Sequence, residues 1–428
     1  MNVYDSQIVT SLLIHKKHIL VSNYQDADIV LINTCTIRDK AVQTVLNYVN
    51  DLKYYKKHKN HDLIIGILGC LAQHMSKHLF EILDVNFVIG PDEYRNISDI
   101  IDQIQNNRNE KICKAKLSTT ETYNDILPYC NENIPHISAF LTIMRGCNNM
   151  CSYCVVPFTR GRERSKDHNS IIQEYKYFIY EGFKEIILLG QNVDSYRDND
   201  VSFAVLLDKL ASINDKIRIR FTTSHPKDLT TDVLKVMKNH DNICKHIHLP
   251  IQSGSNDILK MMNRKYSREE YLDKIYEIRD ILGDKCGLTT DIMVGFCNET
   301  DKDFEDTIDI MNRVKYDSSY TFAYSQREGT QAQKSMIDNI PDDVKKQRLT
   351  EIINLQREHS QYRNDLDLNN TYKVLVEDVS KKSNNELQCR TDHNKIVIIN
   401  KDNHNIGDFV KVKITESFSS CLKGITHE

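Results

Sequence analysis

Residues 139–154 read AFLTIMRGCNNMCSYC, an apolar run followed by three cysteines within eight residues. The run AFLTIM has the length and the aromatic and β-branched content of a buried strand. The three thiols, Cys147, Cys151 and Cys154, therefore follow the carboxyl end of a strand, where α/β barrels and open parallel sheets place their chemistry. Their spacing differs from the paired two-residue spacing of a zinc ribbon.

The chain has 428 residues and twelve cysteines. Its amino terminus lacks the basic and apolar regions of a secretory signal, and it contains no run of about 18 apolar residues. We therefore expect a cytoplasmic protein that does not enter a membrane, in which clustered thiols bind metal instead of forming disulfides. The net charge of -4 would not attract nucleic acid by itself, so any RNA contact must be local.

The three clustered thiols favour an iron–sulfur cluster over zinc. Thiolates suit both, but a zinc site needs a fourth ligand, and the loop offers none before His168. A cubane cluster held by three thiolates leaves one iron open to a further ligand. We therefore predict an open [4Fe-4S] cluster at this loop.

The remaining sequence predicts an α/β multidomain protein. Residues 1–105 alternate apolar runs with helical periodicity, as in a parallel α/β layer, and residues 106–133 are polar and aperiodic, as in a linker. Residues 134–364 contain six strand candidates separated by helical stretches, which predict a partial (β/α)6 barrel, followed by a helix from Pro341 to about Asn364. Residues 365–428 have short alternating runs typical of a small, OB-like β-barrel.

Two further cysteines lie in the N-terminal layer. Cys35 and Cys70 each follow the end of an apolar strand run. Because the carboxyl ends of parallel strands share one edge of a sheet, we expect these two thiols to lie close together. Their position alone leaves open whether they bind a metal or are ordinary buried cysteines.

The cysteine spacing, with Tyr153 before the last thiol, resembles the signature of radical S-adenosylmethionine (SAM) enzymes. The resemblance implies that SAM binds the open iron and is cleaved by one electron to a 5'-deoxyadenosyl radical, which abstracts hydrogen from carbon. It also implies that residues at the strand ends contact the cofactor. These residues are Tyr153, Gly190 and Gln191, then Gln252 and Ser253 on the ribose side, and Gly295 beneath the adenine.

The resemblance narrows to the MiaB-type tRNA methylthiotransferases and covers nearly the whole chain. The shared motifs occur in one order: VVPFTRGRERS, LLGQNV, TTSHP, LPIQSGS, MNRKY and FAYSQREGTQA. The N-terminal layer resembles the auxiliary-cluster domain of this family, and the C-terminal barrel resembles its TRAM module. The resemblance implies methylthiolation of carbon 2 of an isopentenyl-modified adenosine beside the anticodon. It further implies two [4Fe-4S] clusters, SAM, a tRNA anticodon stem-loop, an electron donor such as flavodoxin or ferredoxin, and a monomer.

The auxiliary cluster is where this sequence departs from the family pattern. Cys35 and Cys70 match two of the three expected ligands, but Met1 falls inside the Gly-Cys-Gln-Met-Asn run that carries the first. The first strand and the third ligand are therefore missing from this sequence. We interpret this as a start codon assigned too far downstream, in preference to an adapted two-ligand site. Cys297 replaces a usual proline, and we interpret it as a thiol that binds no metal.

Arg160, Arg162 and Arg164 follow the cysteine loop and are our RNA-binding candidates, because guanidinium groups suit bidentate phosphate contacts. The alternative is a solvated basic loop. From Asp365 onward the chain has nine Lys or Arg against ten Asp or Glu, so RNA binding by the C-terminal barrel rests on resemblance.

Three alternative functions stay open from the sequence. Two are methylthiotransferases that act on threonylcarbamoyladenosine or on an aspartate of a ribosomal protein. The third is a non-catalytic iron–sulfur RNA-binding protein. The motifs LLGQNVDSY and MNRKY favour the isopentenyladenosine substrate.

Overall fold

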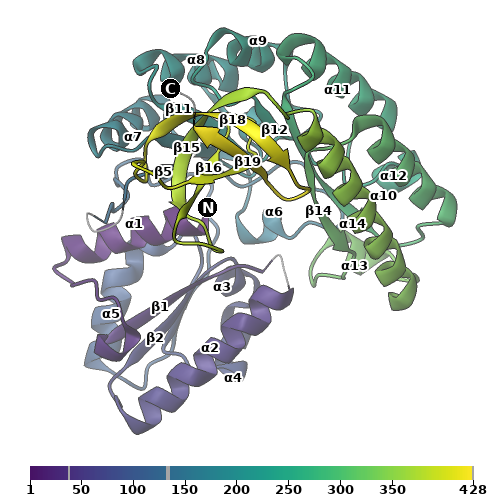
Figure 1. The fold of residues 1–428 in the computed structure, drawn as a ribbon. Helices are drawn as coiled ribbons and strands as arrows, with labels where there is room; N and C mark the ends of the chain where they lie inside the picture. The colour runs from purple at the N-terminus through teal and green to yellow at the C-terminus, as the bar shows by residue number, and fades with distance from the viewer. Residues whose placement is uncertain (37–38, 132–134, 427–428) are drawn as a thin grey trace. The chain divides into compact units, whose positions relative to one another are not determined.

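The computed structural model describes residues 1–36, 39–131 and 135–426 (Figure 1). The chain forms two compact units. The first unit comprises Met1–Asn131, Thr142–Met150 and Cys154–Glu174, and the second comprises Glu132–Leu141, Cys151–Tyr153 and Tyr175–Glu428. The predicted boundary between residues 133 and 134 lies outside the described residues.

The first unit is built on a parallel sheet in the order β1-β2-β3-β4. Every residue of β2 is buried, as expected for a strand covered on both faces. This confirms the predicted parallel α/β layer. The strands are β1 (Ile29–Thr34), β2 (Ile64–Gly69), β3 (Phe87–Ile89) and β4 (Ile112–Lys114), and the helices are α1 (Asn2–His15), α2 (Asp39–His58), α3 (Cys70–Met75), α4 (Leu79–Ile82) and α5 (Ile97–Asn106).

The linker predicted for residues 106–133 is wrong in part. Strand β4 lies inside this segment and pairs with β3, and Tyr123 is fully buried. The sequence did not reveal this strand because its three residues, Ile-Cys-Lys, are too few to show a period.

The second unit contains the six predicted barrel strands, except for Thr142 at the end of β5. They form two three-stranded sheets, in the orders β11-β8-β5 and β12-β13-β14, and a parallel bridge from Ile219 to Ile243 follows β11 toward β12. This confirms the predicted partial barrel. The strands are β5 (Ser138–Thr142), β8 (Glu185–Leu189), β11 (Arg218–Phe221), β12 (His246–His248), β13 (Gly287–Val294) and β14 (Ser318–Ala323).

Two of the barrel helices begin at a capping box. Ser267 and Glu270 form a capping box at the start of α11, and Thr300 and Asp303 form another at the start of α12. The barrel helices are α7 (His168–Tyr180), α8 (Phe203–Ile213), α9 (Thr231–Asn239), α10 (Asn256–Met261), α11 (Arg268–Leu282), α12 (Asp301–Val314), α13 (Gln331–Ser335) and α14 (Asp342–Asp365). No helix in the described part of the chain is both long and apolar enough to cross a membrane.

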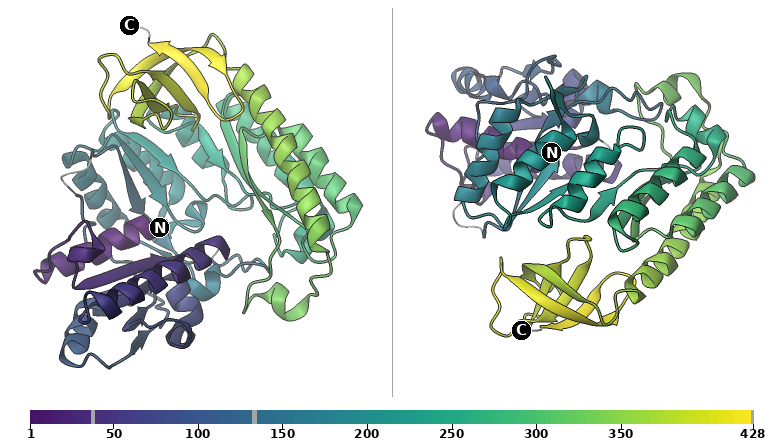
Figure 2. Two further views of the ribbon diagram at one scale, coloured as in Figure 1. Left: turned by 60° about the horizontal axis from the view of Figure 1, so that its bottom comes forward. Right: turned by 90° about the horizontal axis from the view of Figure 1, so that it is seen from above.

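The long helix α14 leads into a closed five-stranded barrel, as predicted (Figure 2). Alternate residues of β15 to β18, such as Val374, Val376, Val412 and Ile414, fill its apolar core together with Leu422 of β19. The strands follow the order β15-β16-β17-β19-β18, with the bounds β15 (Thr371–Val379), β16 (Glu386–Arg390), β17 (Ile396–Asn400), β18 (Phe409–Ser417) and β19 (Leu422–Thr426).

Candidate functional site

The cysteine loop leaves the short strand β6 (Met144–Arg145) through a turn that requires glycine. Gly146 has φ = +78°, and a Cβ atom there would lie 2.1 Å from the carbonyl oxygen of Arg162. The N–H of Cys147 then donates to the carbonyl of Gly161 at 3.2 Å. The backbone at the first thiol is therefore fixed before any ligand binds.

Within the second unit, Ser152 fixes the middle of the loop. Its N–H and hydroxyl donate to the carbonyls of Met262 and Met261, at 3.0 and 2.8 Å, and its own carbonyl accepts the N–H of Ala332 at 2.7 Å. The ring of Tyr153 packs edge-on against Phe296, with ring centres 6.5 Å apart. Cys151 lies beside this anchored residue and is half-buried, as are Cys147 and Cys154.

The predicted juxtaposition of Cys35 and Cys70 is supported by strand register. Strands β1 and β2 run parallel, and their last paired residues are Thr34 and Gly69, which directly precede the two cysteines. Gly69 has φ = +89°, and a Cβ atom there would lie 2.7 Å from the carbonyl oxygen of Thr34. The strand ends therefore approach too closely for any residue but glycine, and both thiols emerge at one edge of the sheet.

The structure corrects our interpretation of Arg160 and Arg164 as phosphate contacts. Their exposed fractions are 2% and 6%, so neither side chain can reach a polyanion on the surface. Arg160 pairs with Asp5 at 2.5 Å and Arg164 pairs with Asp92 at 2.9 Å. Of the three candidates, Arg162 alone is exposed.

These buried arginines form a network in the first unit. Asp5 is fully buried and accepts hydrogen bonds from both Arg145 and Arg160. Burial alone would raise the pKa of Asp5, but the two guanidinium groups outweigh it and hold this pKa below its usual value. Arg160 also donates from Nε to the sulfur of Cys70 at 3.1 Å. The network therefore reaches one of the two N-terminal thiols.

The predicted cofactor residues of the barrel lie at strand ends in the second unit. Gly190 and Gln191 follow β8, and Gly295 follows β13 with φ = +69°. Gln252 also has a positive φ, of 72°, and its N–H and carbonyl bond to Asp291 and Met293 on β13. Their backbone positions thus agree with a site at the carboxyl ends of the strands.

Ser253 is directed into the protein. It is fully buried, and its hydroxyl lies 3.4 Å from the hydroxyl of Thr307 and accepts the N–H of Ser255 at 3.2 Å. Its visible role is therefore to hold the turn that carries Gln252.

Comparison with known families and proteins identifies the family of this chain. Residues 141–311 match the Radical SAM superfamily, residues 1–90 match the uncharacterized protein family UPF0004, and residues 368–425 match the TRAM domain. A tRNA-2-methylthio-N(6)-dimethylallyladenosine synthase from Bacteroides fragilis is 47% identical over 99% of this chain and 93% of its own length. The chain belongs to this synthase family. The synthase of the same name from Karelsulcia muelleri is 48% identical over 99% of this chain and 96% of its own.

The fold of this chain resembles those of two solved proteins of low sequence identity. The radical SAM methyltransferase TsrM from Kitasatospora setae superposes with a TM-score of 0.58 at 9% identity, over 74% of this chain and 69% of its own. The cobalamin-dependent radical SAM enzyme OxsB superposes with a TM-score of 0.53 at 13% identity, over 83% of this chain and 53% of its own.

The residues of the cysteine loop fit the [4Fe-4S] cluster expected in this synthase family. The loop supplies three thiols, the ligand type that iron–sulfur clusters require. Its backbone is fixed at Cys147 and at Ser152, and its thiols are half-buried and so accessible to a ligand.

Sequence analysis did not foresee the contacts among the polar residues, most of them buried, that follow β8 and β11. Asn192 donates to a carboxylate oxygen of Asp228 at 2.7 Å, and Asp194 accepts the N–H of His225 at 3.3 Å. Burial raises the pKa of Asp194 to about 7, and burial, with the nearby charges of Arg264 and Lys227, lowers that of His225 to about 2. The motifs LLGQNVDSY and TTSHP carry these residues at strand ends, a position that could have revealed them.

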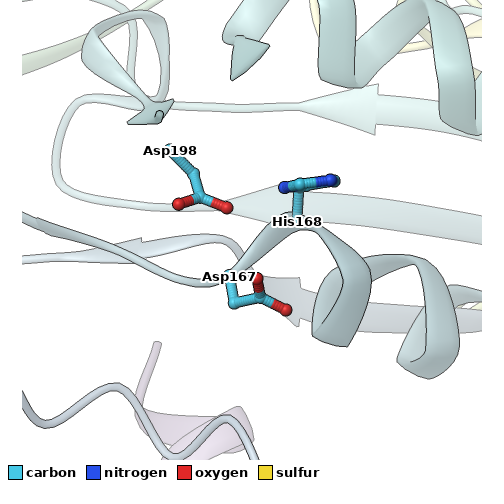
Figure 3. Close-up of side chains that lie close together, drawn as sticks. All are labelled: Asp167, His168 and Asp198. Atoms are coloured by element: carbon cyan, nitrogen blue, oxygen red, sulfur yellow. The ribbon is translucent and has the colours of Figure 1, made fainter. Parts of the chain in front are cut away.

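The start of α7 shows a third polar group. Figure 3 labels Asp167 and His168 there, both in the first unit; the third residue that it labels, Asp198 of the short strand β9 (Arg197–Asp198), belongs to the second unit. Asp167 accepts hydrogen bonds from the N–H of Ser170 at 2.8 Å and from its hydroxyl at 3.0 Å, which lower the pKa of Asp167. Because this carboxylate stabilises the first turn of the helix, we assign it no metal.

Proposed function

We propose that the chain transfers a methylthio group to carbon 2 of N6-dimethylallyladenosine beside the anticodon of tRNA, in the cytoplasm. The single observation that carries this proposal is the three-thiol loop at the carboxyl end of the first barrel strand. The names of the relatives at 47% and 48% identity support the choice of substrate over threonylcarbamoyladenosine and over a ribosomal protein.

Cys147, Cys151 and Cys154 would hold a [4Fe-4S] cluster with one iron open to SAM. The bound cluster and SAM together supply a radical that removes hydrogen from an unactivated aromatic carbon, a step for which no side-chain base suffices. The strand-end backbone at Gly190, Gln191, Gln252 and Gly295 would orient the cofactor. The packed rings of Tyr153 and Phe296 would form an apolar wall beside the loop and help to keep water from the radical.

Cys35 and Cys70 would hold an auxiliary cluster that carries the sulfur to be methylated. Their strands end in register, so the two thiols can bind one group. Arg160 lies against Cys70 and would orient that thiol.

For RNA we propose the TRAM barrel and the exposed Arg162 as contacts. Small barrels of this kind bind single strands by their faces and loops. The anticodon loop already presents partly unstacked bases, so presenting the target adenine costs little. A flavodoxin or ferredoxin would supply electrons, and we propose that the protein acts as a monomer.

Nucleoside analysis of tRNA tests the proposal. A strain lacking the gene should accumulate N6-dimethylallyladenosine without its 2-methylthio derivative, and the wild-type gene should restore the derivative. Cys151→Ala should not restore it, whereas Cys113→Ala, at a half-buried cysteine of β4, should. A strain in which Cys151→Ala restores full modification would refute the proposal. Loss of the 2-methylthio derivative of threonylcarbamoyladenosine from the strain lacking the gene would identify threonylcarbamoyladenosine as the substrate instead.

A further inference from the structure

Arg264, in the loop between α10 and α11, holds a position that the sequence did not reveal. Its exposed fraction is 5%, and its guanidinium donates three hydrogen bonds. Nη1 donates to the sulfur of Cys151 at 3.3 Å, Nε to the hydroxyl of Tyr266 at 2.8 Å, and Nη2 to the carbonyl of Pro250 at 2.9 Å. All four residues belong to the second unit.

Arg264 differs in its partners from the buried Arg160 and Arg348, and resembles Arg218, whose guanidinium donates to the carbonyls of Arg390 and Lys373. Arg160 pairs with Asp5, and Arg348 pairs with Glu299 at 2.8 Å. Among the residues that the structure describes, no carboxylate pairs with Arg264; its neighbours are Tyr266, Tyr153 and Cys151. A buried cation without an anion costs several kcal/mol. A negatively charged sulfur at Cys151 would therefore stabilise the buried guanidinium of Arg264.

The backbone around Arg264 is bent to bring this side chain inward. Asn263 and Lys265, its two neighbours, both have left-handed conformations, with φ of 59° and 62°. Such a conformation is uncommon for a lysine and persists where the surrounding structure requires it. Tyr266 in turn hydrogen-bonds through its hydroxyl to the carbonyls of Pro250 and Ile251, at 3.1 and 2.9 Å. The guanidinium is thus held firmly against the thiol.

We propose that Arg264 is a positioning residue for the cluster at Cys151: its N–H bonds to the ligand sulfur, and its charge balances the thiolate-bound cluster and raises the reduction potential. The inference rests on the proposed function. Reduction adds negative charge, and a neighbouring cation and a hydrogen bond to sulfur stabilise the more negative state. Removing the guanidinium should therefore make the cluster harder to reduce.

A potentiometric titration followed by electron paramagnetic resonance tests this inference. The full-length protein carries Cys35→Ala and Cys70→Ala, so that only the cluster at Cys147, Cys151 and Cys154 is observed after anaerobic reconstitution. Arg264→Gln should lower the ratio of reduced to oxidised cluster about tenfold at a fixed potential, which equals about 59 mV for one electron.

Three further variants make the result specific. Arg264→Lys keeps the charge and should recover part of the shift. Tyr266→Phe keeps the guanidinium but removes one of its acceptors, and should give a smaller shift in the same direction even if Arg264→Gln binds no iron. Arg268→Gln removes an arginine of α11 that pairs with Asp306 at 3.0 Å, and should leave the potential unchanged.

Two outcomes would overturn the inference. One is a potential in Arg264→Gln and Tyr266→Phe equal to that of Arg268→Gln. The other is weaker SAM binding at an unchanged potential, which would mean that Arg264 serves the cofactor carboxylate instead of the cluster. A parent protein that binds no iron would instead refute the proposed function itself.

Discussion

Replacing Asp5 by asparagine should destabilise the first unit more than any conservative surface change. Asp5 is fully buried and accepts hydrogen bonds from two buried guanidinium groups, those of Arg145 at 3.0 Å and Arg160 at 2.5 Å. Asparagine keeps the shape of the side chain but removes the negative charge. Two buried cations then lose their shared partner.

The magnitude follows from the cost of leaving a buried charge unpaired. Removing one partner of a buried ion pair typically costs about 3 to 5 kcal/mol. For a folding unit of this size, each kcal/mol of unfolding free energy that is lost lowers the thermal unfolding midpoint by roughly 2 to 4 °C, so this midpoint should fall by about 6 to 20 °C.

Scanning calorimetry of the full-length protein measures this shift in the transition of the first unit. The matched control is Asp125→Asn, which removes the same charge from a largely exposed pair with Arg95 in the same unit. An exposed pair contributes about 0 to 1 kcal/mol, so this variant should unfold close to the wild type. Equal midpoints for the two variants would refute the reasoning.

The stability difference between the wild type and Asp5→Asn should depend on pH. The folded pKa of Asp5 lies below its unfolded value because Arg160 and Arg145 outweigh the effect of burial. Its contribution to stability is therefore present above the unfolded pKa and is lost as the pH falls through the folded pKa. The difference between wild type and Asp5→Asn should accordingly shrink in acid. A difference that grew as the pH fell would contradict the assignment.

Three further predictions concern other parts of the chain. Burial raises the pKa of Asp194 from 3.8 to about 7, so the wild type should lose up to about 4 kcal/mol of stability relative to Asp194→Asn as the pH rises from 4 to 8, measured by urea unfolding. Gly69→Ala should lower the free energy of unfolding by at least about 1 to 3 kcal/mol in the same assay, because its positive φ strains the new residue and its Cβ atom clashes with Thr34. The control Gly283→Ala has the same backbone strain but its Cβ atom meets no neighbour, so it should lose less stability. Arg218→Gln loses hydrogen bonds to the carbonyls of Arg390 and Lys373, and hydrogen exchange of β15 and β16 should rise about fivefold or more, unlike in Lys216→Gln.

The parts of the protein that local patterns encode could be predicted from the sequence alone. The six barrel strands, the helix after Pro341 and the five-stranded C-terminal barrel each show a clear period bounded by turn residues. The cysteine loop was equally clear, because its three thiols lie within eight residues directly after a strand. Its chemistry depends on the type and spacing of the ligands, and both can be read directly from the sequence.

The roles of the arginines, in contrast, were decided by tertiary structure. A basic run after the loop suggested phosphate contacts, yet Arg160 pairs with Asp5, 155 positions away, and Arg164 pairs with Asp92, 72 positions away. Arg264 meets Cys151 across 113 positions. No local pattern reports whether a charge is buried or which partner it meets, because burial and ion pairing arise only when distant segments pack together.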